Sequence, residues 1–182
     1  MNDLVARAGK EAARYLDSPA VAQRWVHVQA VGARAAELAA AVDPADRDLL
    51  IGAALLHDIG YAPELVMTGF HPLDGASHLE RAGFPRRLVA LVAHHSGARF
   101  EAAERGLLRE LEAWPLEDSP VMDALVAADL TTGPRGQRFS FDERLDEILA
   151  RYPAGSVVHR AMSRARPVLA VHVERVDARL SR

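Results

Sequence analysis

The fold is decided by the stretch Leu55-Leu56-His57-Asp58-Ile59-Gly60, where an apolar helical run ends in two polar side chains. Imidazole nitrogen and carboxylate oxygen are both good ligands of divalent metal ions. Neighbours on a helix point about 100° apart, so His57 and Asp58 can straddle one metal ion or serve two. The doublet therefore predicts helices that converge on a metal centre, with the carboxylate of Asp58 as a bridge.

The composition restricts both the class of protein and the kind of metal site. A chain of 182 residues suits one domain and can bury a hydrophobic core without cross-links. It contains no cysteine, so histidine and carboxylate must hold any metal ion. A net charge of −3 argues against a partner such as duplex nucleic acid, which favours a basic protein surface. No stretch resembles a secretory signal or a membrane span, and we expect a cytoplasmic protein that binds no membrane.

The hydrophobic pattern predicts an all-α fold. Apolar residues recur at steps of three and four, no strict alternation persists, and proline and glycine stand at segment ends. Gly60 is expected to end its helix in the left-handed conformation. The predicted helices cover residues 3–16, 20–42, 44–59, 72–82, 85–95, 99–112, 120–130, 141–152 and 156–180.

Candidate metal ligands stand on both sides of the doublet, on separate predicted helices. Each lies at a segment end or beside an apolar face, where its side chain can point inward. His94 is preferred to His95 because it shares a face with Leu88 and Leu91 at three-residue steps. The candidate ligands are His27, His57, Asp58, His71, His94 and Asp129. Nitrogen and oxygen ligands suit one or two divalent ions of iron, manganese, nickel, cobalt or zinc.

These six residues, in this order, resemble the H…HD…H…H…D pattern of the HD-domain superfamily. The resemblance spans about residues 20–135 and implies a compact core of about five helices around one or two divalent metal ions. The pair His71 and His94 is similar to that of the dinuclear branch. We expect a single domain over residues 1–182, with a C-terminal helical extension over about residues 140–182. Its long, arginine-rich last helix permits a homodimer.

The resemblance implies hydrolysis of a phosphate ester or nucleotide by metal-activated water. In this reaction Asp58 would orient the nucleophile, and His95 would contact the substrate or act as an acid. Lys10 is the only lysine among 22 basic residues, so we expect arginine to bind the phosphate. The candidates are Arg99, which would also stabilise the transition state, and Arg135 and Arg138 after Asp129.

The expected substrate is a small phosphorylated molecule, and a nucleotide is one candidate. Two departures from the family pattern bear on this choice. Many related phosphohydrolases carry lysine three residues after the doublet, where this chain has Tyr61. The Gly-Tyr-Pro signature of cyclic dinucleotide phosphodiesterases is missing after His94 and His95. Two alternatives stay open: an HD-type di-iron oxygenase with the same six ligands, and a catalytically silent regulatory module that binds metal.

Overall fold

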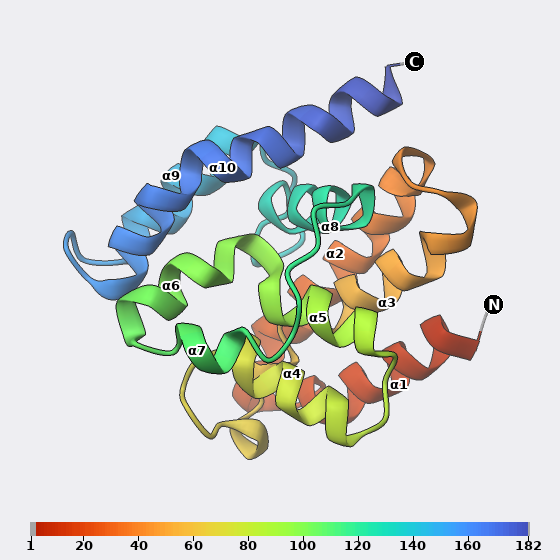
Figure 1. The fold of residues 1–182 in the computed structure, drawn as a ribbon, viewed down its shortest axis with the longest axis horizontal. Coiled ribbons are helices and arrows are strands. Elements are labelled where there is room, and N and C mark those ends of the chain that lie inside the picture. Colours follow the sequence, from red (N-terminus) through yellow and green to blue (C-terminus); the bar gives the residue numbers. More distant parts are fainter. Residues whose placement is uncertain (1–2, 182) are drawn as a thin grey trace.

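The computed structural model describes residues 3–181, and the regular elements within them are helices (Figure 1). The helices are α1 (Asp3–Leu16), α2 (Ala22–Leu38), α3 (Arg47–Leu56), α4 (His71–Arg81), α5 (Arg86–His94), α6 (Ala98–Arg105), α7 (Leu108–Leu111), α8 (Pro120–Leu130), α9 (Phe141–Arg151) and α10 (Val157–Leu180). Extended pairing within residues 3–181 is limited to one isolated bridge between Thr132 and Arg138. The predicted all-α fold is confirmed. Over the same residues, no helix combines the length and the apolar character that crossing a bilayer requires.

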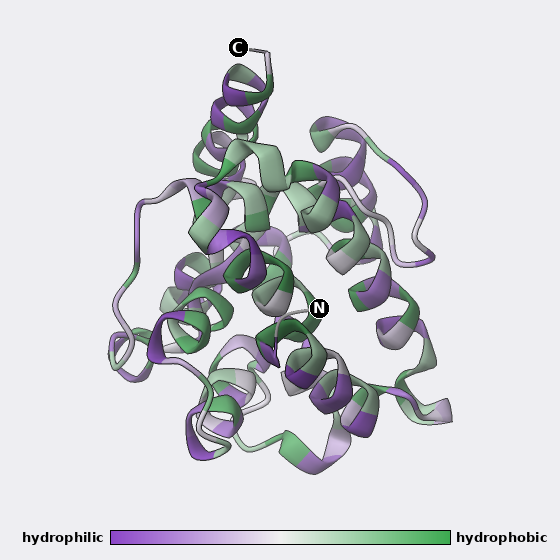
Figure 2. Cartoon of the chain, turned by 90° about the vertical axis from the view of Figure 1, so that its right-hand side faces the viewer, coloured by the Kyte–Doolittle hydropathy of each residue, from purple (hydrophilic) through white to green (hydrophobic). Residues whose placement is uncertain are grey.

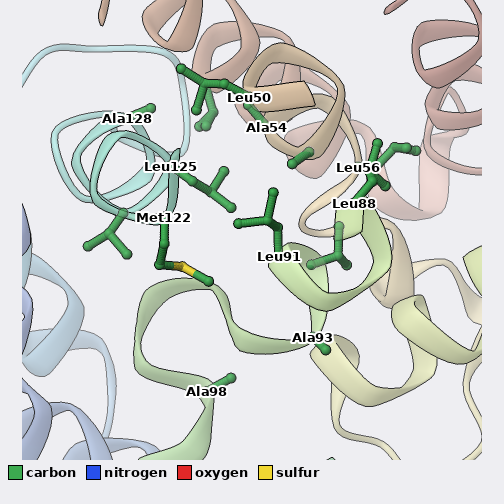
Figure 3. Close-up of a cluster of buried hydrophobic side chains, with 14 of the residues drawn as sticks. Leu50, Ala54, Leu56, Leu88, Leu91, Ala93, Ala98, Met122, Leu125 and Ala128 are labelled. Carbon is green, nitrogen blue, oxygen red and sulfur yellow. The ribbon is translucent and has the colours of Figure 1, made fainter. Parts of the chain in front are cut away.

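The middle of the fold is α3, which packs against α1, α2, α5 and α8. Its sequence is almost entirely apolar after the first two residues, so it can be buried on most of its sides. Figure 3 shows Leu50 and Leu56 of α3 facing Leu88 of α5 and Leu125 of α8. The outer helices carry both hydrophilic and hydrophobic residues, as expected for helices that bury one side (Figure 2). The doublet thus follows directly from the central helix of the bundle.

Two predicted helix ends are wrong, for different reasons. The segment predicted as one helix over residues 99–112 is divided into α6 and α7, because Gly106 ends α6 with φ 72°. Gly60 has no positive φ and lies inside the 3₁₀ turn Ile59–Tyr61. A Cβ atom on Gly60 would lie 2.0 Å from the main-chain oxygen of His71. Glycine is required there because the turn after the doublet touches the start of α4.

The C-terminal helices α9 and α10 cover one side of the bundle, beside α6 and α8 (Figure 1). A wholly buried carboxylate, Asp123 of α8, ties α10 to the core. It accepts hydrogen bonds of 2.6 Å from Nδ1 of His172 and from Nη2 of Arg179. A buried carboxylate is tolerated only when such partners replace water, so these contacts fix where α10 lies.

We predict that Asp123→Asn lowers the free energy of unfolding by about 2 kcal/mol, because the amide leaves the cations on α10 without a counter-charge. The matched control is Asp118→Asn, which removes an exposed partner of Arg175 and should change stability little. Urea unfolding followed by circular dichroism measures both. Equal stability of the two variants would contradict the role of Asp123.

Candidate metal centre

Six polar side chains meet where the ends of several helices converge. His27 lies within α2, the doublet His57 and Asp58 directly follows α3, and His71 begins α4. His95 directly follows α5, and Asp129 is the last residue but one of α8. All six are buried except His71, which is partly exposed. The structure therefore brings together five of the six predicted ligands, namely His27, His57, Asp58, His71 and Asp129, with His95 as the sixth member.

One half of the cluster surrounds Asp129 and Oδ2 of Asp58. Nε2 of His27 lies 3.1 Å from Oδ1 of Asp129, and Nε2 of His57 lies 3.7 Å from the same oxygen. Nε2 of His57 is also 3.6 Å from Oδ2 of Asp58. Single atoms of His27, His57 and Asp129 all lie within 4.8 Å of one another, which is close enough for one cation to reach all three.

The other half surrounds Oδ1 of Asp58. Nε2 of His71 lies 3.3 Å from this oxygen, and Nε2 of His95 lies 3.8 Å from it. The two Nε2 atoms are 3.3 Å apart. Each oxygen of Asp58 therefore faces a different pair of imidazoles, which is the arrangement expected of a bridging carboxylate.

In three of the imidazole rings, Nδ1 points away from the cluster and forms a hydrogen bond with a main-chain oxygen. Nδ1 of His27 donates to the main-chain oxygen of Gly133 at 3.1 Å. His57 and His95 donate in the same way to main-chain oxygens within their own helices, at 2.8 and 2.6 Å. A carbonyl oxygen only accepts, so a proton lies on Nδ1 of each ring, and Nε2 is the nitrogen that faces the cluster and carries the lone pair when the ring is neutral. This tautomer is the one that a metal-binding histidine needs.

The polar atoms at the centre of the cluster are of the kind that bind a cation. Nε2 of His57 is buried and has no hydrogen-bond partner, although a buried polar atom normally has one. Two carboxylates, Asp58 and Asp129, lie within 4 Å of the Nε2 atom of the same ring, His57. A divalent ion would satisfy these atoms together, and the mixed nitrogen and oxygen set suits a transition metal. The residues present therefore fit one or two divalent cations.

The charges agree with this donor set. Burial alone would raise the pKa of Asp58, but Arg24 and His57 outweigh it and hold that pKa well below its usual range. The pKa of Asp129 is likewise lowered, because His57 and His27 outweigh its burial. Burial lowers the pKa of both His71 and His95, whereas for His27 the effect of burial is outweighed by Asp129, which raises the pKa of that ring. Ionised carboxylates and neutral imidazoles are the forms that bind a metal ion.

A cation and an aromatic ring support the exposed edge of the cluster. Nη1 of Arg24 donates to Oδ2 of Asp58 at 2.6 Å, and its guanidinium lies 4.0 Å from the centre of the Tyr61 ring. Tyr61 stacks on His71 with ring centres 4.0 Å apart and an interplanar angle of 17°. Tyr61 thus orients His71, and Arg24 supplies a positive charge beside the doublet that sequence reasoning missed.

The prediction that His94 joins the cluster is wrong. Nε2 of His94 instead donates to the main-chain oxygen of Trp114 at 2.8 Å. The helical phase used to choose His94 ends with α5, because His95 has ψ 152° and Ser96 has φ 47°. This turn directs His95 into the cluster, and the Ser96 hydroxyl donates a hydrogen bond to Oδ2 of Asp129.

The three arginines expected to bind phosphate lie elsewhere. Arg99 lies over the ring of Phe100 and lines a different pocket. Arg135 and Arg138 are exposed on the loop after α8, where Arg138 pairs with Glu37. None of the three arginines lines the pocket at the cluster, which α9 borders with Arg144 and Arg151.

A pocket of about 90 Å³ adjoins the cluster. Asp58, His71 and His95 line one side of it, together with Arg24. The C-terminal part of the chain also lines it, with Arg144, Arg151, Tyr152, Val158 and Met162. Arg144 is only 4% exposed, pairs with Glu147, and leaves its Nε without a hydrogen-bond partner. The charged and titratable groups that line the pocket are thus two aspartates and three imidazoles of the cluster, the carboxylate of Glu101, and the guanidinium groups of Arg24, Arg144 and Arg151.

A family model for the HD domain matches residues 24–129, more than half of the chain. The chain therefore belongs to the HD-domain family. The match begins at Arg24, ends at Asp129 and includes all six residues of the cluster, whereas α9 and α10 follow it. The chain has no significant match among curated proteins or among solved structures.

We predict that His95→Gln weakens Mn²⁺ binding more than about tenfold, whereas the matched variant His94→Gln leaves it nearly unchanged. Of these two histidines, only His95 has a ring nitrogen within 4 Å of Asp58. Metal content per chain and Mn²⁺ titration by calorimetry measure the difference, with circular dichroism as a check on folding. Wild-type Mn²⁺ affinity in a folded His95→Gln protein would contradict the assignment.

Proposed function

We propose that this protein is a metal-dependent phosphohydrolase that cleaves the ester bond of a small phosphorylated molecule. The observation that carries the proposal is the position of Asp58. Its two oxygens face two separate imidazole pairs, and the same residue lines a pocket with guanidinium groups at its edge. A site for divalent cations beside a site for an anion is what phosphoryl transfer requires.

The ligands proposed are His27, His57, Asp58, His71, His95 and Asp129. Divalent cations bound there would supply hydroxide at neutral pH and offset the negative charge of the phosphoryl group. Both nitrogens of His95 are engaged, Nδ1 with the main chain and Nε2 toward Asp58. We therefore propose His95 as a ligand, in place of the proton donor considered from the sequence.

The chain itself positions the reacting groups. Asp58 stays ionised because Arg24 and the surrounding imidazoles hold its pKa down, so it can orient the attacking water. The hydroxyl of Ser96 and the ring of His27 hold Asp129 from two sides. In the proposed reaction the water oxygen bonds to phosphorus, the ester P–O bond breaks, and the departing oxygen takes up a proton.

The pocket indicates which part of the substrate is enclosed. A volume of about 90 Å³ is small beside the roughly 300–1,000 Å³ of a site that encloses a whole drug-sized ligand. It suits a phosphoryl group and the first atoms attached to it. Arg144 is the proposed anchor for the phosphoryl oxygens, because a buried guanidinium with one carboxylate partner can still donate to an oxyanion.

The test is phosphate release from a panel of phosphate monoesters and nucleotides by Mn²⁺-loaded protein. We expect release by the wild type and none by Asp58→Ala, which loses the proposed bridge. The iron-loaded protein should consume no oxygen in the same assays. A metal-loaded protein that consumes oxygen, or one that hydrolyses no ester in the panel, would contradict the proposal in favour of an oxygenase or a regulatory module.

We predict that Arg144→Gln raises KM for the best substrate about tenfold or more, because a charged hydrogen bond to phosphate is lost. The change in kcat should be smaller, and the metal content should stay that of the wild type. The matched control is Arg166→Gln on α10, whose partners are the exposed carboxylates of Asp142 and Asp146. An unchanged KM in Arg144→Gln would remove this residue from the substrate site.

A further inference from the structure

A second, larger pocket lies beyond the turn that carries His95. Its volume is about 420 Å³, within the range of small-molecule sites. Its walls come from α6, from residues 112–119, from α8 and from α10. His94 lines this pocket whereas its neighbour His95 lines the pocket at the cluster, and Gly97 lines both. The His95–Gly97 turn therefore separates the two pockets.

The walls of this second pocket are apolar, although part of them is exposed. Phe100, Met122 and Val126 form part of its lining. Leu116 is 50% exposed, and Val168 and Val171 of α10 are 36% and 41% exposed. Apolar side chains that are grouped around a concavity and left open to water commonly mark a binding site.

One positive charge at this pocket has no ionic partner within residues 3–181. Arg99 is exposed, and its recorded contact is with the ring of Phe100, 4.9 Å from its guanidinium carbon. The other charged lining residues are paired: Arg175 with Asp118 at 2.7 Å, and Glu117 with Arg87 at 2.8 Å. The pocket thus combines apolar walls with one cation that is free to bind an anion.

We propose that this pocket binds a small amphipathic anion, an apolar body that carries a single carboxylate or sulfonate. The apolar body would lie between Phe100 and the valines of α10, and the anionic group would pair with Arg99. A second copy of the chain is a poorer fit, because a stable protein interface needs about 20–30 residues on each side. Here three exposed hydrophobic residues surround a concave pocket.

The proposal is independent of the phosphohydrolase activity. It uses α6, α8 and α10, and none of the residues proposed as metal ligands lines this pocket. Its test therefore needs neither a substrate nor a bound metal ion.

The probe is 8-anilinonaphthalene-1-sulfonate, an aromatic anion whose fluorescence rises in apolar surroundings. We expect saturable binding of one probe per chain, before and after treatment with EDTA, and displacement by decanoate. Val171→Glu places a negative charge in the pocket, and Arg99→Gln removes the proposed partner of the sulfonate. Each should weaken probe binding about tenfold, which corresponds to roughly 1.4 kcal/mol. The matched controls are Val66→Glu and Arg86→Gln, exposed positions outside both pockets.

Three results would overturn the proposal. The first is the absence of saturable binding, or equal binding by the pocket variants and their controls. The second is equally effective displacement of the probe by decanol and by decanoate. Because decanol has no carboxylate, this result would show that Arg99 does not bind the anionic group. The third is a dimer in sedimentation velocity that Val171→Glu dissociates, which would make this surface an interface between copies.

Discussion

The structure depends on the burial of one carboxylate among imidazoles. Asp58 is 3% exposed, and an isolated ionised carboxylate at that depth would cost several kcal/mol. Arg24 offsets this cost on one side at 2.6 Å, and the ring nitrogens of four histidines stand within 4 Å of its oxygens. Three of those rings are held by main-chain carbonyls in the tautomer that directs a lone pair inward. The nitrogen and oxygen atoms that meet at its centre could hold a further positive charge.

Most residues of the cluster are brought together because they lie at the ends of helices. The doublet, His71 and His95 all stand at helix termini, where the chain changes direction and a side chain can leave the helical phase. Two tight points set the geometry: Gly60 against the start of α4, and Ser96 with its left-handed backbone beside Asp129. A non-glycine residue at positive φ is costly, and such strain is common at functional sites. Packing of α3 in the core therefore fixes the cluster only together with these two turns.

The sequence predicted what depends on local pattern. Helical periodicity gave the all-α fold, and α1 and α8 begin and end where expected. The choice of His94 over His95 failed because it extended a helical phase by one residue too many, and φ and ψ at a helix end are set by tertiary contacts. Arg24 had a usable signal, since it stands three residues before His27 on the same helix face. Arg144 had none, because only the packing of α9 brings it to the pocket.

The C-terminal helices α9 and α10 lie outside the residues matched by the family model, yet they help to line both pockets. Residues 24–129 contain the whole cluster, so the residues that could hold a metal ion belong to the shared domain. The walls of both pockets, however, draw on α9 or α10: Arg144 and Met162 at the cluster, Val168 and Val171 behind it. Asp123 in the core holds α10 in place through buried ionic contacts. The walls of the two pockets are therefore shared between the matched domain, which supplies Arg24, Arg99 and Phe100, and the C-terminal helices that follow it. Substitutions in α9 or α10 can change what either pocket accepts while the cluster stays the same.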